Sequence, residues 1–267
     1  MKRTVAMVGR RVGGTAVTLA GMVLLVFLAV RLVPGDPVDQ LLGDGATEAE
    51  RTELRTQMHL DGSLPEQLVA TVGDIADGSL GTSYALRNEP TPVVELLVEN
   101  APHTLALALA SLVFAVLLAL PLGLLAAVRQ DSLVDHGARG LALVAISTPA
   151  FVSGPLALYV LAVLLEVVPT PAHKANALQE LALPACVIGF ALSGRLARIL
   201  RATALEQLRA DYVKAAHLRG IAPWRVVVRH VLPNAALPVL TVLGLQLAAL
   251  LGGALVTERI FARPGIG

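Results

Sequence analysis

Residues 104–128 read TLALALASLVFAVLLALPLGLLAAV, an apolar run of 25 residues without a charge. As an α-helix with a rise of about 1.5 Å per residue, the run is about 37 Å long. That length exceeds the roughly 30 Å hydrocarbon core of a bilayer, and a soluble core does not need so long an uncharged segment. The run therefore predicts a transmembrane helix.

Three further runs predict the same structure. Val12–Val30, Gly140–Leu165 and Asn234–Thr257 are uncharged over 19, 26 and 24 residues. Of the 267 residues, 55% are hydrophobic and only 15% are charged. Because soluble domains carry roughly 25% charged residues, this composition also indicates a membrane protein. We therefore expect an all-α, polytopic helix bundle.

A fifth span is expected from about Leu178 to about Leu196, where the uncharged run is shorter. Arg195, Arg198 and Arg201 occur at its end. An arginine at mid-bilayer costs about 2.5–3.5 kcal/mol on an insertion scale. We therefore expect all three arginines at the cytoplasmic end of this span, with their side chains extended towards water.

The N-terminus predicts a retained span rather than a cleaved signal peptide. A signal core has about 7–15 apolar residues and ends at a small-residue cleavage site. Here the basic segment Lys2–Arg11 is followed by 19 uncharged residues, and the run ends in Arg31-Leu32-Val33-Pro34-Gly35-Asp36-Pro37. We expect this first span to stay in the mature protein.

The distribution of charge predicts the orientation of the spans. Residues 34–100 hold 13 acidic residues and three arginines, whereas residues 195–229 hold eight basic and two acidic residues. Cytoplasmic segments of membrane proteins are enriched in Lys and Arg. We therefore expect the N-terminus and segment 195–229 in the cytoplasm, and segment 34–100 and the C-terminus outside.

Segment 34–100 predicts a small external lobe. Thr47–His59 has the pattern of a short helix, because Thr47 is followed three residues later by Glu50, as in a capping box. Pro65–Ile75 predicts a second short helix. The expected organisation is residues 1–33 for the N-terminus and first span, 34–100 for the lobe, and 101–267 for the permease core with its cytoplasmic segment 195–233.

The run Gly140–Leu165 contains Pro149 and Pro155, with Ser147 and Ser153 close by. Proline kinks a helix, which membrane proteins tolerate where neighbours or cavity water satisfy the freed backbone groups. Two interpretations stay open. Ser147, Pro149 and Ser153 line a transport pathway at a broken helix, or the prolines produce an ordinary kink.

The polar segment 195–233 is longer than a connection between two spans needs. One face of its first helix is expected to carry Leu205, Leu208, Tyr212, Ala215 and Ala216. Gly220 is expected to end this helix in a left-handed conformation, and Pro223 to start a second helix that ends at Leu232-Pro233. The two small alanines would let another protein approach closely, although a basic amphipathic helix on anionic lipid fits the same pattern.

The spacing in this segment resembles the coupling signature of ABC importer permeases, which reads Glu-Ala-Ala-x3-Gly-x9-Ile-x-Leu-Pro. The segment reads Lys214-Ala215-Ala216-x3-Gly220-x9-His230-x-Leu232-Pro233. Lys214 and His230 replace the glutamate and the isoleucine. Such replacements are familiar in the peptide and nickel branch of the family, whose members often carry Asp-Tyr-Val just before, like Asp211-Tyr212-Val213 here.

Four more motifs resemble that branch and occur in its order. They are Arg31-Leu32-x-Pro34-Gly35-Asp36-Pro37, Gly78–Ser83, Ile188–Arg201 and Glu258-x2-Phe261-x2-Pro264-Gly265-Ile266-Gly267. The resemblance implies a type I importer fold in a bacterial cytoplasmic membrane. It also implies a second permease subunit, two cytoplasmic ATPases and an external substrate-binding protein as partners. The ATPase-coupling residues would be Asp211, Tyr212, Ala215, Ala216, Gly220, Leu232 and Pro233.

No catalytic or metal-binding residue is predicted in this chain itself. None of its three lysines follows a GxxxxGK[ST] loop, so ATP and magnesium are expected only in partner ATPases. The six histidines show no pair at i, i+4 spacing, and Cys186 is a single cysteine. The expected cargo is a peptide or a nickel chelate, membrane lipid surrounds the spans, and no nucleic acid is expected to bind.

Two other classes of protein stay open. An ion-coupled secondary transporter would need inverted repeats and buried carboxylates near the midplane, whereas the predicted spans hold no Asp or Glu except Glu180 at one end. A membrane scaffold that transports nothing would show no behaviour linked to nucleotide. Co-purification with an ATPase would separate the importer from both.

The resemblance also makes a prediction about the end of the chain. Relatives continue after Pro264-Gly265-Ile266-Gly267 with a sixth span, and this sequence stops there. We therefore expect a truncated permease with five membrane helices. Its fifth helix should expose a face of small and apolar residues made of Gly244, Ala248, Leu251 and Gly252.

Overall fold

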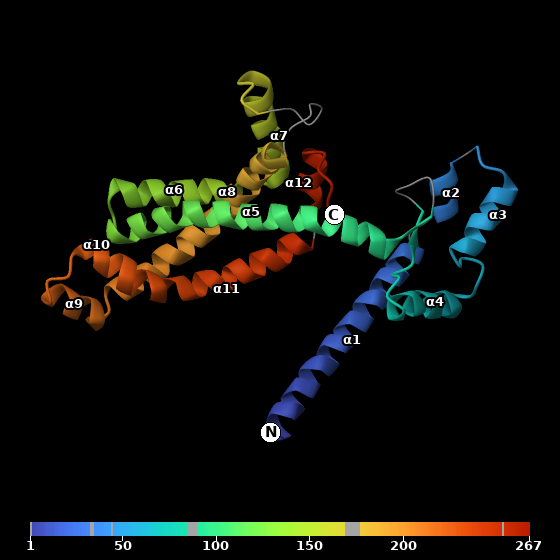
Figure 1. The fold of residues 1–267 in the computed structure, drawn as a ribbon, viewed down its shortest axis with the longest axis horizontal. Helices are drawn as coiled ribbons and strands as arrows, with labels where there is room; N and C mark the ends of the chain where they lie inside the picture. Colours follow the sequence, from blue (N-terminus) through green and yellow to red (C-terminus); the bar gives the residue numbers. More distant parts are fainter. Residues whose placement is uncertain (1, 33–34, 44, 85–89, 169–176, 253) are drawn as a thin grey trace. The chain divides into compact units, whose positions relative to one another are not determined.

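The computed structural model describes residues 2–32, 35–43, 45–84, 90–168, 177–252 and 254–267. Over these ranges the regular secondary structure is helical apart from one two-stranded ladder, which confirms the all-α prediction (Figure 1). The chain divides into two compact units, Met1–Leu97 and Val98–Gly267. The predicted boundaries after residues 33 and 100 stay predictions. Val33 and Pro34 of the first motif, and His173, lie outside the described residues.

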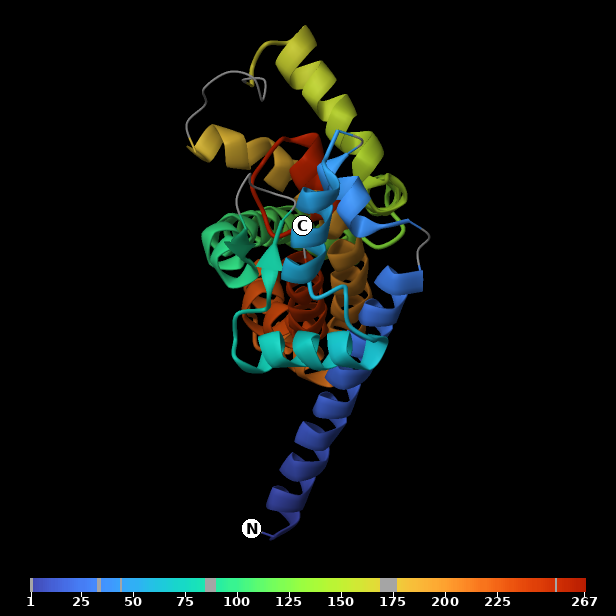
Figure 2. The ribbon, with the colours of Figure 1, turned by 90° about the vertical axis from the view of Figure 1, so that its right-hand side faces the viewer.

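The first unit begins with a long helix followed by a lobe of short elements (Figure 2). Its elements are α1 (Lys2–Leu32), α2 (Pro37–Leu42), α3 (Glu48–Gln57), α4 (Leu64–Ala76), β1 (Thr82–Ser83) and β2 (Thr91–Pro92), the two strands being antiparallel. The end of α1 is tied to α4, because Arg31 Nε donates to Gln67 Oε1 at 2.9 Å. The same guanidinium lies 4.2 Å above the centroid of the Phe27 ring.

Local sequence sets the start of both longer lobe helices. The Glu50 carboxylate accepts the Thr47 N–H at 2.7 Å, and the Thr47 hydroxyl accepts the Glu50 N–H, which completes a capping box at α3. At α4 the Glu66 carboxylate accepts the Ser63 N–H at 2.7 Å. These backbone hydrogen bonds lower the pKa of both glutamates, and hydrogen bonds to the side chains of the capping residues lower it further by a smaller amount. The two helices predicted in the lobe are thereby confirmed.

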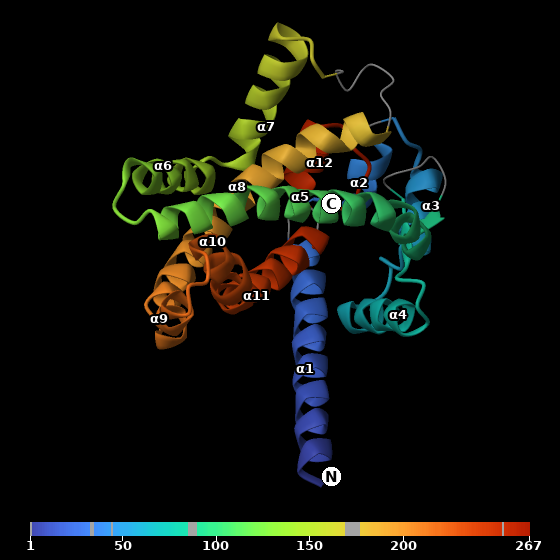
Figure 3. The same ribbon diagram turned by 60° about the vertical axis from the view of Figure 1, so that its left-hand side comes forward.

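The second unit is a helix bundle (Figure 3). It comprises α5 (Val93–Val128) from Val98 onward, α6 (Leu133–Ser147), α7 (Ala150–Leu158), the π-helix η1 (Tyr159–Leu164), α8 (Ala177–Leu208), α9 (Asp211–Leu218), α10 (Pro223–Val226), the π-helix η2 (Val227–Val231), α11 (Leu232–Leu251) and α12 (Leu255–Ile260).

Small residues let α8 pack closely against its neighbours. A Cβ at Gly189 would lie 2.6 Å from the carbonyl oxygen of Ser111 on α5, and a Cβ at Gly194 would lie 2.5 Å from that of Ala142 on α6. On another side of α8, the Thr203 hydroxyl donates to a backbone carbonyl of α11 at 2.9 Å. Helices in lipid associate through such close contacts because apolar burial gives them no driving force. The bundle is therefore built around α8.

In the part of the chain that the structure describes, four helical segments are long and apolar enough to cross a membrane. They are Gly9–Leu32, Val93–Val128, Glu180–Leu208 and Pro223–Leu251. The predicted span Gly140–Leu165 is not one helix, since α6 and the following helix Ala150–Leu164 bend by 99° at a short break. Thr148 precedes a proline and is extended, with φ −91° and ψ 110°, because the proline ring disfavours the helical conformation of the residue before it. Within the described residues the chain has five candidate spans if the bent pair crosses as one.

Two helices also end at residues other than the predicted ones. α8 continues past Leu196 to Leu208, so Arg195 lies 13 residues before its end, which is about 20 Å along the axis. Pro233 does not interrupt the helix either, because the π-helical turn η2 precedes it and the helix runs from Pro223 to Leu251. The predicted face of α11 is confirmed, since Gly244, Ala248, Leu251 and Gly252 are all exposed in this chain.

Candidate functional site

The predicted coupling segment folds as a short helix between two long ones (Figure 1). α8 ends at Leu208, α9 spans Asp211–Leu218, and a new helix starts at Pro223 as predicted. The face expected to run continuously from Leu205 to Ala216 is thus divided between α8 and α9. A separate short helix at the end of the bundle results.

Gly220 ends α9 in the left-handed conformation that its sequence position predicts. Its φ is +72°. The Gly220 N–H donates to the His217 carbonyl at 2.9 Å, and the Ile221 N–H donates to the Ala216 carbonyl at 3.3 Å. These two hydrogen bonds define a Schellman motif, which satisfies the last carbonyls of a helix. A Cβ at Gly220 would meet no atom within 4 Å, so the backbone conformation, not space, requires glycine here.

The two alanines of the signature point in different directions. Ala216 is only 6% exposed and packs in the hydrophobic core with Val213 and Val226, whereas Ala215 is exposed. Val213 and Ala216 are three residues apart, so they share the inner face of α9. The expected common surface is corrected: of the two alanines, only Ala215 is open to a partner.

The outer face of α9 combines charge with one large apolar side chain. Asp211 and Lys214 are exposed and form an ion pair of 2.9 Å, and Leu218 is 90% exposed. A surface ion pair of this kind contributes little to stability. With Ala215, these side chains form the surface that a partner would meet.

The remaining signature residues join α9 to its neighbours. The Tyr212 hydroxyl donates to Gln207 Oε1 at 2.8 Å, in the last turn of α8, and lies 3.4 Å from the His230 carbonyl oxygen in η2. Leu232 is half-buried against the bundle core, and Pro233 is exposed. Tyr212 therefore links α9 to the helices on both sides of it.

Beside this segment lies a buried ion pair that the sequence did not predict. Asp135, in the first turn of α6, is fully buried and accepts hydrogen bonds from Arg201 Nε and Nη2, each at 2.6 Å. Arg139 Nε lies 3.2 Å from the same carboxylate. The expectation that Arg201 extends towards water is therefore wrong. Asp135 and Arg201 are 66 residues apart in the chain, so no local pattern reveals their pairing.

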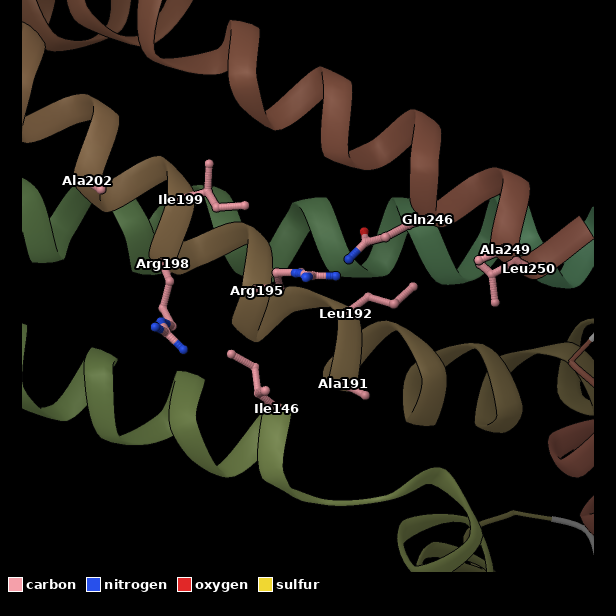
Figure 4. A pocket seen from close by; sticks show the side chains of 10 residues that line it. All are labelled: Ile146, Ala191, Leu192, Arg195, Arg198, Ile199, Ala202, Gln246, Ala249 and Leu250. Atoms are coloured by element: carbon pink, nitrogen blue, oxygen red, sulfur yellow. The ribbon is translucent and has the colours of Figure 1, made fainter. Parts of the chain in front are cut away.

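The residues predicted to line a pathway lie at the bend between α6 and α7. Ser147 is the last residue of α6, Pro149 precedes α7, and the Ser153 hydroxyl donates to the Pro149 carbonyl at 3.3 Å. A cavity of about 770 Å³ lies between α6, α8 and α11 (Figure 4). Its lining includes Ile146, next to the bend, but none of the three predicted residues.

The C-terminal motif is held by a buried carboxylate. Glu258 is 3% exposed and accepts hydrogen bonds from the Thr104 hydroxyl at 2.8 Å and from the Gly267 N–H at 3.0 Å. Just after the C-terminal end of α5, Gln130 accepts a hydrogen bond of 3.5 Å from Arg209, which lies just before α9. Because 26 residues of helix and turn separate Thr104 from Gln130, the C-terminal motif and the start of α9 lie about 39 Å apart along α5.

Comparison with known proteins gives a family for this architecture. Residues 119–267 match the family described as "Binding-protein-dependent transport system inner membrane component". The chain belongs to that family and is the membrane-spanning permease subunit of an importer.

Three relatives are similar over nearly the whole chain. The "Probable D,D-dipeptide transport system permease protein DdpB" of Escherichia coli K12 is 37% identical over 97% of this chain and 83% of its own. The di/tripeptide transport system permease protein DppB of Pseudomonas aeruginosa is 36% identical over 97% of this chain and 84% of its own. The dipeptide transport system permease protein DppB of E. coli K12 is 33% identical over the same shares.

Proposed function

We propose that this permease subunit moves peptides inward across the bacterial cytoplasmic membrane, and that α9 receives the energy of ATP hydrolysis from a partner ATPase. The observation that carries the coupling is the geometry of α9, a short exposed helix bounded by α8 and by the Gly220 turn. The peptide cargo is supported by the names of the three relatives, which are peptide or dipeptide permeases. Those names favour a peptide over a nickel chelate.

The inner face of α9 supports a mechanical role for this helix. Val213 and Ala216 belong to the same buried cluster as Leu200 on α8 and Val231 on η2. Tightly packed side chains transmit displacement because they leave no space to deform. A push or pull on the outer face at Ala215 would therefore move α8 and the helix Pro223–Leu251 together.

The partners in this proposal are a second permease subunit, two cytoplasmic ATPases and an external substrate-binding protein. ATP and magnesium bind in the ATPases, and this chain catalyses no reaction. Closure of the ATPases around ATP would shift the two permeases between inward-open and outward-open states, as a two-state equilibrium biased by nucleotide. Backbone groups freed at the bend, near Ser147, Pro149 and Ser153, would then face the pathway.

The proposed orientation places the N-terminus and segment 195–233 in the cytoplasm. Residues 34–100 form an external lobe, and residues 101–267 form the core that moves. The charge asymmetry supports this arrangement. The separation of α9 from the C-terminal motif along α5 supports it too, because the two would lie on opposite sides of the membrane.

The direct test is transport by the assembled complex in proteoliposomes with its binding protein. We expect uptake of a radiolabelled dipeptide that requires ATP, and no uptake of a nickel chelate under the same conditions. ATP-dependent uptake of nickel alone would refute the peptide cargo. Recovery of the chain without any ATPase would refute the importer and favour a scaffold.

A further inference from the structure

The cavity between α6, α8 and α11 has the size of a small-molecule site. Its volume of about 770 Å³ falls within the roughly 300–1,000 Å³ typical of such sites. Most of its lining is apolar, for example Leu192 and Leu250, and three polar side chains reach it: Arg195, Arg198 and Gln246 (Figure 4). An apolar cavity with a few polar groups is the usual form of a binding site.

The two arginines of this cavity have no counterion in the part of the chain that the structure describes. Arg195 and Arg198 occupy successive turns of α8, and Arg201 on the next turn is bound by the buried Asp135. No hydrogen bond or ion pair joins either of the first two to a described residue. Arg195 lies six residues from Arg201, about 9 Å farther from α9. Cationic side chains within a membrane bundle are costly and usually face an anion or a polar cavity.

Gln246 is the third polar residue of the cavity lining. It is 7% exposed, and its Oε1 atom is buried without a hydrogen-bond partner among the described residues. In Figure 4 the amide nitrogen of Gln246, from α11, faces the guanidinium of Arg195, from α8, and the amide oxygen points away from it. The site therefore offers two guanidinium groups and, beside them, the side chain of Gln246.

We propose that this cavity binds the C-terminal end of a peptide inside the permease. Arg195 and Arg198 bind the terminal carboxylate, because a guanidinium matches the planar carboxylate with paired N–H donors. The apolar walls hold the last side chain. This assignment rests on the proposed function, in which the cargo is a peptide, and it adds the part of the peptide that is recognised.

A cysteine placed in the cavity tests this proposal. Ala249 lines the cavity and is exposed to it, whereas Leu237 is exposed on the same helix but outside the cavity. Ala249→Cys and Leu237→Cys are made separately with Cys186→Ala, and the assembled transporter is labelled with a neutral maleimide in phosphatidylcholine nanodiscs. Millimolar L-alanyl-L-alanine should slow labelling at position 249 at least threefold and leave position 237 unchanged. L-Alanyl-L-alaninamide, which lacks the carboxylate, should not protect.

Variants then assign the protection to the arginines. Arg195→Gln combined with Arg198→Gln should abolish protection at position 249, and Arg259→Gln, an exposed arginine of α12 outside the cavity, should leave it intact. Unchanged labelling at position 237 serves as the control for folding. Equal labelling of wild type with and without the peptide would overturn the proposal, as would protection that persists in the double variant.

Three further outcomes distinguish failure of the binding subsite from failure of the proposed transport. If phosphatidylglycerol nanodiscs protect position 249 without any peptide, a lipid headgroup is the bound anion and the peptide subsite is refuted. If L-alanyl-L-alanine protects but no ATP-driven uptake occurs, the binding subsite is supported and the proposed transport fails. If uptake occurs without protection, transport stands and the subsite is refuted.

Discussion

Gly220 acts through its backbone. Its φ of +72° lies in the region that glycine enters freely and that β-branched residues avoid at a cost of about 1–2 kcal/mol. Asparagine enters this region more readily than other side chains do. A Cβ at this position would meet no atom within 4 Å. Substitutions of Gly220 therefore test the backbone conformation and not the space available for a side chain.

We expect Gly220→Val to weaken coupling and Gly220→Asn to retain most of it. Valine would open the Schellman turn and displace α10 relative to α9, whereas asparagine would keep the turn. The measurement is peptide-stimulated ATP hydrolysis of the assembled complex, together with recovery of the ATPases in a pull-down. Normal stimulation and recovery in the valine variant would remove the turn from the coupling mechanism.

Asp135 holds Arg201 in the interior of the bundle, and its removal would leave that guanidinium without its partner. Breaking a buried ion pair from one side destabilises by about 3–5 kcal/mol. We therefore expect Asp135→Asn to lower the thermal unfolding midpoint clearly. Asp131→Asn is the matched control, because Asp131 is exposed and its φ of +61° suits asparagine. Equal midpoints for the two variants would contradict the role given to Asp135.

The helices α3 and α4 start at capping boxes that depend on ionised glutamates. The pKa of Glu50 and of Glu66 is lowered by hydrogen bonds from the capping residues. A lowered folded-state pKa means that the contribution to stability is complete above the ordinary glutamate pKa of about 4.3. It is lost as the pH falls through the lowered value.

We therefore expect α3 and α4 to lose protection in acid. Hydrogen–deuterium exchange of peptides covering 48–57 and 64–76, corrected for intrinsic rates, should show less protection at pH 3 than at pH 7. In Glu50→Gln, a neutral residue that still accepts the Thr47 N–H, the pH dependence should disappear for α3 and remain for α4. If Glu50→Gln abolishes the pH dependence of protection in both helices, or in neither helix, the capping boxes are not the source of that dependence.

These elements also show what the sequence can predict. The boxes at Thr47 and Ser63 and the stop at Gly220 involve neighbours along the chain, so their residue types indicate them directly. Prolines were less informative. Pro102, Pro121, Pro184 and Pro238 lie inside continuous helices, whereas the chain breaks at Pro149. Whether a proline ends a helix depends on the tertiary contacts around it. A single sequence does not reveal those contacts.

The sequence predicted where the coupling segment lies in the chain, but not which residues its side chains contact. The spacing around Gly220 located α9, yet the burial of Ala216 follows from packing against α8 and α10. The pairing of Asp135 with Arg201, and the convergence of Arg195 and Gln246 on one cavity, join residues that are distant in the chain. Such contacts depend on the tertiary fold and leave no mark in local patterns.

The whole molecule crosses the membrane in an orientation that two cysteines can test. In a Cys186→Ala background, Asp61→Cys lies in the first unit's lobe, and Arg209→Cys lies just before α9; both positions are exposed. In intact cells an impermeant thiol reagent should label position 61 and spare position 209. Permeabilised cells should label both, which controls for reactivity. The reverse pattern in intact cells would overturn the proposed topology and the coupling with it.

The central claim is that α9 docks on a cytoplasmic ATPase, and cross-linking from Ala215 tests it most directly. A photo-crosslinking amino acid at this exposed position is activated in living cells, with Val256 on α12, beside the C-terminal motif, as an exposed control. We predict a covalent adduct between position 215 and the ATPase subunit, and none from position 256. Adducts from position 215 to lipid alone, with no ATPase, would contradict the account and show that α9 lies on the membrane surface.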